Sequence, residues 1–365
     1  MAVAFCISGH GFGHASRQVE VINALGQLCP TVPIALFTEA SPWLLDRTVR
    51  VPVARRPWAV DTGAVQRDSL HLDIGATLEA AARFEASADA AAVSLAREFR
   101  AAGTRVVVCD APAMPCTAAA LAGIPAIVLA NFTWDWIYED FIDDHAGVDD
   151  LPRRLGARYA EADAAWRLPM YGGFQTFRTV LDFPWIARRS MRDPHDTRRL
   201  IGAVDGRPLV LISFGGYGVS GMTLAHHAGA PYRLVLSAGA QHGTTDAPAD
   251  SVHADRDSLD ALGLRYEDLV AACDVVVSKP GYGIVSECVA NGTALLYTDR
   301  GRFREYPVMV EQMPSVMRCG FLANDLLAHG RWDAEVEALL AQPAPAARPL
   351  VNGAEVAAGM LSAML

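Results

Sequence analysis

Short, continuous apolar runs recur along the chain and alternate with longer stretches of helical periodicity. In the first half, apolar runs of strand length lie at 3–7, 34–37, 106–109 and 126–129. Helical patterns lie between them at 17–28, 76–101 and 116–122. Strands that are apolar throughout are typical of a parallel sheet covered by helices on both faces, and the alternation favours right-handed crossovers.

The alternation stops in the middle of the chain and then starts again. From about 159 to 200 the sequence carries prolines, a glycine pair, aromatic residues and arginines, and we interpret this stretch as a connection between domains. Further strands are predicted at 209–214, 233–237, 275–277 and 294–297, with helices near 266–272, 284–290, 305–319 and 333–340. The pattern predicts an α/β protein of two doubly wound domains in tandem.

Composition is consistent with this organisation. A chain of 365 residues accommodates two domains, and 52% hydrophobic with 20% charged residues is typical of a globular enzyme. The net charge of −10 argues against nonspecific binding to nucleic acid or to an anionic membrane. The sequence shows neither an apolar run of membrane-spanning length nor a signal peptide, so we expect a cytoplasmic protein. Seven cysteines without a Cys-x-x-Cys pair are interpreted as reduced packing residues.

Two glycine-rich turns carry the strongest chemical signal. Ser8-Gly-His-Gly-Phe-Gly-His14 follows the first apolar run, and Ser278-Lys-Pro-Gly-Tyr-Gly283 follows the run that ends at 277. Each turn precedes a predicted helix. A strand, a glycine turn and a helix together present backbone N–H groups and a positive helix end to an anion. Two such units suggest two domains with a ligand between them.

The downstream turn favours a diphosphate. Gly281 and Gly283 allow close backbone approach, and the helix that follows ends at a good C-terminal signal, Asn291-Gly292. Glu287, one turn inside the helix, is near enough to accept hydrogen bonds from a ribose diol. An ordinary structural turn with a solvated Glu287 is an equally good interpretation of these residues alone.

The upstream turn adds two histidines. His14 is expected at the start of the first helix, where a neutral imidazole can remove a proton from a hydroxyl nucleophile. A helix-start residue without a catalytic role is the alternative. Cys6, His10 and His14 are not expected to converge on a metal ion, because Cys6 belongs to the strand.

Other polar residues follow predicted strands. Asp110 closes the strand at 106–109, and Trp134 and Asp135 follow the strand at 126–129. Aromatic rings beside a carboxylate suit a sugar, although core packing explains the tryptophans equally well. The match of 216–221 to G-x-G-x-x-G lacks an acidic residue after the next strand, which argues against NAD, and a Walker motif is absent. Asp255 and Asp257 are interpreted as helix-capping residues.

Three motifs in order resemble a known family. The chain carries Gly-His-Gly-Phe-Gly-His-x-x-Arg from Gly9, Asn-Phe-x-Trp-Asp from Asn131 and Lys-x-Gly-Tyr-Gly-x-x-Ser-Glu from Lys279. This set resembles GT-B glycosyltransferases of the MurG-like type, and most of all the glycosyltransferase-like N-terminal region of L-arabinokinases. The resemblance covers nearly the whole chain but does not extend to the sugar-kinase domain of those proteins.

The resemblance implies two Rossmann-like domains facing across a cleft. We expect an acceptor-side domain at 1–170, a connection at 171–200, a nucleotide-sugar-binding domain at 201–345, and a C-terminal helix in 346–365 that packs back on the first domain. It also implies transfer of a hexosyl or pentosyl group from a nucleotide sugar, expected to be UDP-linked, to a hydroxyl of a small molecule. Inversion is expected, and neither a metal nor another cofactor is implied.

Site residues follow from the same resemblance. The implied donor-binding residues are Gly215, Gly216, Lys279, Gly281, Tyr282, Gly283, Glu287, Arg302, Arg304 and Glu305. The implied acceptor-side residues are His10, Gly11, Phe12, Gly13 and Trp134. His14 is the candidate base, with Asp110 and Asp135 as alternatives. Two other functions remain open: a non-catalytic nucleotide-sugar-binding module, and a nucleotide-sugar epimerase or hydrolase on the same fold.

Overall fold

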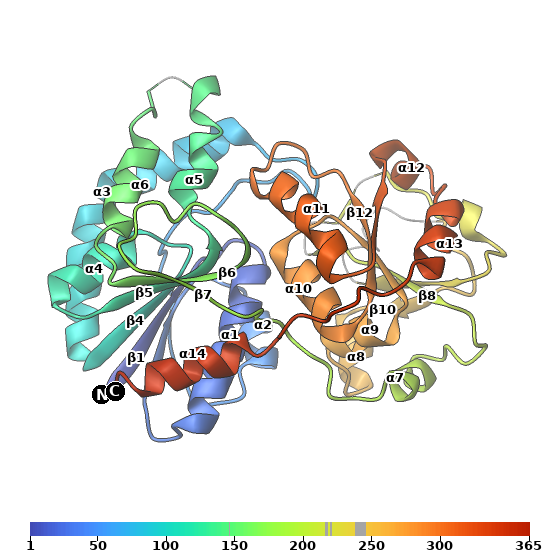
Figure 1. The fold of residues 1–365 in the computed structure, drawn as a ribbon, viewed down its shortest axis with the longest axis horizontal. Helices are drawn as coiled ribbons and strands as arrows, with labels where there is room; N and C mark the ends of the chain where they lie inside the picture. The colour runs from blue at the N-terminus through green and yellow to red at the C-terminus, as the bar shows by residue number, and fades with distance from the viewer. Residues whose placement is uncertain (146, 216–217, 220, 238–245) are drawn as a thin grey trace. The chain divides into compact units, whose positions relative to one another are not determined.

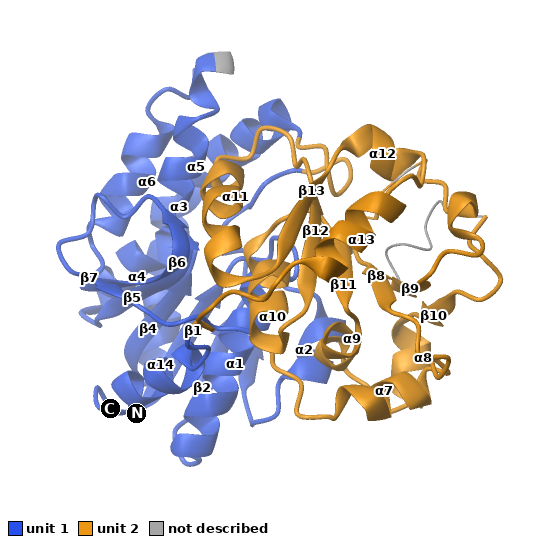
Figure 2. Cartoon of the chain, turned by 45° about the vertical axis from the view of Figure 1, so that its right-hand side comes forward, with its two compact units in different colours: residues 1–65, 73–187, 350–365 blue, residues 66–72, 188–349 orange. Residues whose placement is uncertain are grey.

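The apolar runs of the sequence form the strands of two parallel sheets. The computed structural model describes residues 1–145, 147–215, 218–219, 221–237 and 246–365. It divides into a first unit of residues 1–65, 73–187 and 350–365, and a second unit of residues 66–72 and 188–349 (Figure 2). The second unit begins at 188, inside the stretch expected to connect the two domains, and it also includes residues 66–72, while residues 350–365 belong to the first unit.

The first unit contains a seven-stranded sheet in the order β3-β2-β1-β4-β5-β6-β7 (Figure 1). Its elements are β1 (Ala2–Ile7), α1 (Gly13–Leu28), β2 (Ile34–Phe37), α2 (Pro42–Thr48), β3 (Ala54–Arg56), α3 (Ile74–Ala101), β4 (Thr104–Asp110), α4 (Met114–Ala122), β5 (Ala126–Phe132), α5 (Trp134–Glu139), α6 (Leu151–Tyr159), β6 (Ala164–Gly172), β7 (Val180–Asp182) and α14 (Gly353–Ser362). All residues of β1 and β5 are buried, as expected for central strands covered on both faces.

The second unit contains a six-stranded sheet in the order β10-β9-β8-β11-β12-β13. Its elements are α7 (Pro194–Leu200), β8 (Leu209–Ile212), β9 (Arg233–Ser237), β10 (Val252–Ala254), α8 (Arg256–Ala261), α9 (Tyr266–Ala272), β11 (Val275–Ser278), α10 (Tyr282–Asn291), β12 (Ala294–Thr298), α11 (Glu305–Val316), β13 (Cys319–Leu322), α12 (Asn324–Ala328) and α13 (Asp333–Ala341). The core of this sheet includes Val210, Ile212, Val275 and Val277, and Leu70 from the 66–72 segment packs against them.

The structure corrects the prediction mainly at the sheet edges. The stretch interpreted as a connection contains β6 and β7, and the helix expected at 305–319 ends at Val316, so that Cys319 begins a strand. β7 and β13 are edge strands with partly exposed residues. β6, the neighbour of β7, mixes buried positions with half-buried and exposed ones. Half-exposed strands lack the continuous apolar run on which the prediction relied.

Smaller expectations can also be compared with the structure. Asp255 is the N-cap of α8 and accepts a hydrogen bond from the backbone N–H of Ser258 at 2.8 Å, so its capping role is confirmed. All seven cysteines are unpaired and five are buried. α14 packs along α1 in the first unit (Figures 1 and 2). Among the described helices, none has the length and apolarity needed to cross a membrane.

Each sheet has one point where the strand order reverses. In the first sheet this point lies between β1 and β4, and in the second sheet it lies between β8 and β11. Open α/β sheets bind ligands beyond the carboxyl ends of the strands at such a point. The turns after β1 and β11 therefore lie where each sheet is most suited to a ligand.

Candidate active site

Asp110 is the centre of a buried polar cluster in the first unit. It is the last residue of β4 and is fully buried. Arg17 donates to both carboxylate oxygens, from Nε at 2.6 Å and from Nη2 at 2.5 Å, and Gln18 Nε2 donates at 3.0 Å. Burial alone would raise the pKa of Asp110, but the charge and hydrogen bonds of Arg17, helped by His14, lower it to about 2. Asp110 is therefore ionised at neutral pH.

His14 lies against this carboxylate. Its Nδ1 is 2.9 Å from Asp110 Oδ1, and its side chain is almost fully buried. Arg17 Nη2 lies 3.0 Å from the same nitrogen but already donates to Asp110. Because two acceptors cannot face each other favourably, we assign the Nδ1 proton to the bond with Asp110. Nε2 is then the basic nitrogen, and among the described residues it has no hydrogen-bond partner.

The helical spacing of α1 creates this arrangement. His14, Arg17 and Gln18 are three and four residues apart, so they lie on one face of the helix, directed at the end of β4. Arg17 Nη1 also donates to Asn131 in β5 at 2.6 Å, which ties a third element to the cluster. Ala111, immediately after Asp110, has a positive φ of 70°, an unusual backbone conformation of the kind that concentrates at functional sites.

A second carboxylate, Asp61, lies nearby. Its two oxygens accept hydrogen bonds from Ser8 Oγ and Trp134 Nε1, each at 2.9 Å. Burial raises the pKa of Asp61 to about 6, although Ser8, Trp134 and the charge of His14 oppose the rise. Sequence analysis missed Asp61, which lies between β3 and α3 in a stretch without strand or helix periodicity.

The upstream turn is shaped by close contacts. Gly11 has a φ of 64°, and a Cβ on Gly63 would lie 2.3 Å from the Cβ of His10. The backbone N–H of Ala64 donates to His10 Nδ1 at 3.3 Å, which orients the ring. Gly13 begins α1, and the Phe12 ring lies 6.4 Å from that of Trp43.

The structure places the other first-unit candidates differently. Trp134 is only 1% exposed, so its ring supports Asp61 instead of presenting a face to a sugar. Asp135 lies in the first turn of α5, where its Oδ1 accepts from the backbone N–H of Trp136 at 2.9 Å, and burial raises its pKa. No described contact joins Asp135 to His14 or Asp110. The described cluster therefore unites His14 with Asp110, but not with Asp135.

In the second unit, the ends of β8 and β11 are linked by serine hydroxyls. Ser278 Oγ donates to the carbonyl of Ser213 at 2.5 Å, and Ser213 Oγ lies 2.6 Å from the hydroxyl of Tyr266. Gly215, beyond β8, has a φ of 69°. Gly216, which was predicted to contact the donor, lies outside the described residues.

The start of α10 has the features of an anion site. Gly281 is the N-cap, no described side chain caps the helix there, and Tyr282 and Gly283 form its first turn. The first N–H groups of a helix and its dipole favour a negative charge. Lys279 is half-buried in the turn, two residues before Gly281, and its pKa is lowered to about 7 by burial and by the charge of Arg300, against the effects of Glu305 and Asp68.

The residues after β12 are arranged around Arg300, which sequence analysis missed. Arg300 is buried, forms an ion pair with Glu305, and lies 3.5 Å from the carbonyl of Pro280. Glu305 begins α11, and Arg304 is its N-cap. Arg302 is exposed. Glu305, one of the three residues predicted here, is therefore connected to the glycine turn through Arg300.

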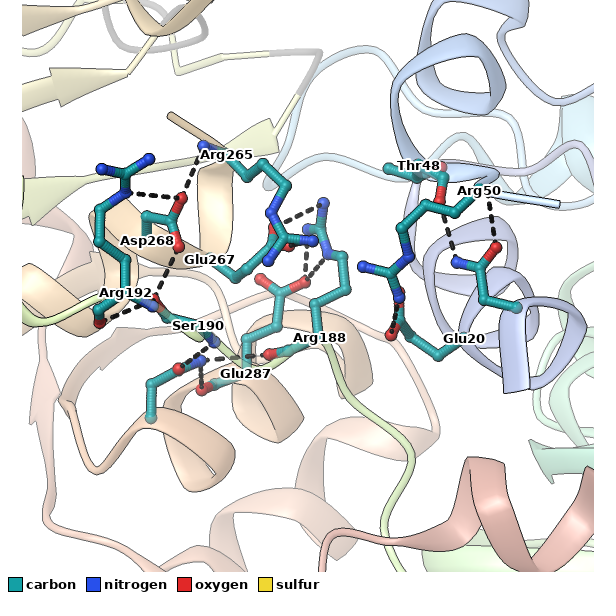
Figure 3. Close-up of polar contacts among 12 residues, drawn as sticks. Glu20, Thr48, Arg50, Arg188, Ser190, Arg192, Arg265, Glu267, Asp268 and Glu287 are labelled. Carbon is teal, nitrogen blue, oxygen red and sulfur yellow. Dashed lines mark hydrogen bonds and ion pairs between the residues drawn. The ribbon is translucent and has the colours of Figure 1, made fainter. Parts of the chain in front are cut away.

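Glu287 is part of a buried charge network (Figure 3). Arg188 donates from Nε to Glu287 Oε1 at 2.7 Å and lies over the Tyr266 ring. Glu267 lies 3.9 Å from Arg188 and 3.1 Å from Arg265. Burial disfavours the charged form of Arg188 and acts to lower its pKa. The negative charges of Glu287 and Glu267 outweigh burial, so the pKa is raised. Glu287 is thus oriented by a partner from the predicted connection, and no sequence signal identified Arg188.

Within the described part of the chain, no group of three or more histidine, cysteine, aspartate or glutamate side chains is arranged to hold a metal ion. The polar clusters at the two sheets instead pair their carboxylates with arginines: Asp110 with Arg17, Glu287 with Arg188, and Glu305 with Arg300.

Comparison with curated proteins finds one informative relative. No protein-family model matches the chain. L-arabinokinase of Arabidopsis thaliana is 29% identical over 367 residues, which cover 99% of this chain and 34% of that protein. The chain therefore spans about a third of the length of this relative.

Several solved structures with a similar architecture are glycosyltransferases. The glycotransferase of kitacinnamycin superposes with a TM-score of 0.66 at 14% identity, covering 100% of this chain and 99% of its own. UDP-glucose: anthocyanidin 3-O-glucosyltransferase, in complex with UDP, has a TM-score of 0.60 at 11% identity and coverages of 100% and 93%. VinC, in complex with dTDP, has a TM-score of 0.57 at 13% identity and coverages of 100% and 95%. The two parallel sheets and these likenesses show that the chain has the GT-B fold of glycosyltransferases, an α/β fold with two Rossmann-like domains.

Proposed function

We propose that this protein is a glycosyltransferase that moves a sugar from a nucleotide sugar to a hydroxyl of a small molecule. The observation that carries the proposal is the pairing of His14 with Asp110 at the point where the first sheet reverses its strand order. An ionised carboxylate that holds Nδ1–H leaves Nε2 as a base and stabilises the imidazolium formed when it accepts a proton. Fold alone would not support this function, since the same fold hosts many activities.

The second unit is proposed to bind the donor. The start of α10 favours the diphosphate, and Lys279 adds a positive charge when it is protonated. Glu287, fixed by Arg188, is the proposed acceptor of hydrogen bonds from the ribose hydroxyls. Gly215, at a positive φ beside β11, allows the backbone to approach the phosphates.

The proposed reaction is a direct displacement at the anomeric carbon of the donor sugar. The acceptor oxygen attacks the anomeric carbon and gives its proton to His14 Nε2. The bond between the anomeric carbon and the diphosphate oxygen breaks, and the nucleoside diphosphate leaves with the electron pair. The N–H groups and the dipole at the start of α10 stabilise the charge that develops on the leaving group. Direct attack opposite the leaving group inverts the anomeric centre.

We propose a UDP-linked donor and no metal requirement. The anthocyanidin glucosyltransferase contains UDP, which supports this choice, whereas VinC contains dTDP, so both nucleotides belong in the test. Lys279 and the start of α10 offer the positive potential that a divalent ion would otherwise supply to the diphosphate.

The first prediction concerns His14. Donor panels of UDP-, dTDP- and GDP-sugars, combined with hydroxyl acceptors, are assayed by mass spectrometry with and without EDTA. We expect His14→Ala to reduce product formation by about 100-fold or more, because loss of a general base typically costs 10² to 10⁴. Its dissociation constant for the donor, measured by calorimetry, should stay within about 2-fold of the wild type, since His14 lies in the acceptor-side unit.

The matched control is His253→Ala, which removes an exposed histidine from β10. It should leave both turnover and donor affinity unchanged. Donor binding without transfer in the wild type would instead favour a non-catalytic binding module. Product formation unaffected by His14→Ala would remove this residue from the mechanism.

A further inference from the structure

Asp61 is an ionisable group beside the proposed base that the reaction scheme leaves unused. It is half-buried, and among the contacts of the described residues each of its oxygens accepts one hydrogen bond, from Ser8 and from Trp134 respectively. A carboxylate accepts about four hydrogen bonds, so each oxygen of Asp61 retains capacity for another donor. A carboxylate held in this way is ready to bind a hydroxyl group.

The surroundings of Asp61 hold it in a fixed position. The hydroxyl of Tyr138 donates to the carbonyl of Gly63 at 3.1 Å, and the Tyr138 ring stacks on Trp134 with centroids 5.2 Å apart. The N–H of Ala64 donates to His10. The loop at 61–64 is therefore attached to α5 on one side and to the upstream turn on the other, which preorganises the carboxylate.

Asp61 is linked to the surroundings of His14 through Trp134 and His10. The His10 centroid lies 6.0 Å from that of Trp134, the donor to Asp61, and 6.5 Å from that of His14. His14 Nε2 and Asp61 can each accept a further hydrogen bond, so an acceptor molecule that satisfies both must supply two donors, as two hydroxyl groups of one compound do. A compound with one hydroxyl would leave one of the two groups desolvated and unpaired, and sites built for hydrogen bonding reject such compounds strongly.

We propose that Asp61 is a specificity-determining residue that binds a second hydroxyl of the acceptor, and that the acceptor is a polyhydroxy compound, a free sugar or a polyol. This inference rests on the proposed function for the role of His14. The raised pKa of Asp61 is consistent with a carboxylate that burial has removed from part of its water and that a ligand hydroxyl can stabilise again.

The test measures binding and does not depend on turnover. L-Arabinose, D-glucose and myo-inositol are titrated against the full chain at pH 8 by saturation-transfer NMR, with 4-nitrophenol and ethanolamine as a monohydroxyl and an amine probe. We expect at least one of the polyhydroxy probes to bind more tightly than the other two compounds. Asp61→Asn should weaken that binding at least 10-fold, and Asp149→Asn, at an exposed position of the same unit, should leave it unchanged.

Ser8→Ala provides a second variant, because it removes one donor to Asp61 and should weaken the same probe by a smaller factor. A preference of the wild type for 4-nitrophenol or ethanolamine, or polyol binding unaffected by Asp61→Asn, would overturn the proposal. Thermal melting checks that each variant is folded. UDP binding, measured by calorimetry, tests the proposed function separately from the role of Asp61. Absence of UDP binding would contradict the proposed function. Selective loss of polyol binding in Asp61→Asn would still support the role of Asp61.

Discussion

At the residue scale, two neighbouring carboxylates have opposite electrostatic environments. Asp110 is buried but faces Arg17, and its pKa falls to about 2. Within the described part of the chain, Asp61 accepts from a hydroxyl and an indole N–H but faces no arginine, so burial dominates and its pKa rises to about 6. Pairs of titratable groups whose pKa values are separated in this way commonly divide acid and base roles. Here Asp110 supports His14 as a permanent anion, and Asp61 titrates close to neutral pH.

The raised pKa of Asp61 predicts a pH-dependent stability. Because the folded state holds this proton up to about pH 6 and the unfolded state only to about 3.8, stability is lost as the pH rises through that interval. Asp61→Asn removes the effect. The free energy of unfolding of the variant, taken relative to that of the wild type, should therefore increase by about 1 to 3 kcal/mol from pH 4.5 to pH 8, as measured by urea unfolding.

Asp149→Asn, which changes an exposed carboxylate, is the control for this comparison and should show no such trend. A difference between Asp61→Asn and the wild type that stays constant across the pH range would contradict the prediction. The low pKa of Asp110 has the opposite effect, because stability falls as the pH drops from 3.8 through about 2. This interval lies below the one in which Asp61 acts, so the two effects do not overlap.

At the element scale, α10 combines a favourable ligand site with an unfavourable helix start. Its N-cap is Gly281, without a described capping side chain, although aspartate or asparagine would stabilise that position. Gly281 has extended backbone angles, and a Cβ there would meet Arg300 Nη1 only at 3.7 Å, so larger residues fit. The start of α10, where no described side chain forms a cap, is therefore consistent with N–H groups that bind a ligand anion.

Gly281→Asp tests this interpretation. The new carboxylate should cap α10 and raise the free energy of unfolding by about 0.3 kcal/mol. It should also repel a diphosphate and weaken UDP binding at least 10-fold by calorimetry, because like charges meet at the helix start. Gly281→Asn supplies a similar cap without the charge and should weaken UDP binding less. Equal affinities of the two variants would show that the diphosphate does not lie at this helix end.

At the scale of the whole molecule, the chain returns to its first unit at the end. α14 packs on α1, the helix that carries His14 and Arg17, and buries Ala357, Ala358 and Leu361. Gly353, at its start, is in close contact with the carbonyl of Pro184, where a Cβ would lie 2.4 Å away. The last residues therefore help to hold the helix that supplies the proposed base.

Leu361→Ala should destabilise the protein by about 2 to 5 kcal/mol in urea unfolding, because it leaves a cavity at a fully buried position. UDP affinity should be unchanged, since α14 belongs to the first unit and the proposed donor residues to the second. Leu350→Ala, at a side chain that is 71% exposed, is the control and should have little effect. A stability loss below 1 kcal/mol for Leu361→Ala would contradict this role of the helix.

The sequence by itself determined the central strands, the tandem α/β organisation and the two glycine turns, because these depend on local apolar runs and backbone requirements. β1, β4, β5 and β11 each contain a continuous buried apolar run, and these runs are predicted directly. Only the tertiary structure decided the pairing of Arg17 with Asp110, of Arg188 with Glu287, and of Asp61 with Ser8 and Trp134. These partners are 53 to 99 residues apart and come from different elements, so no local pattern connects them. Burial then fixes their charge states, and burial is a property of the folded chain.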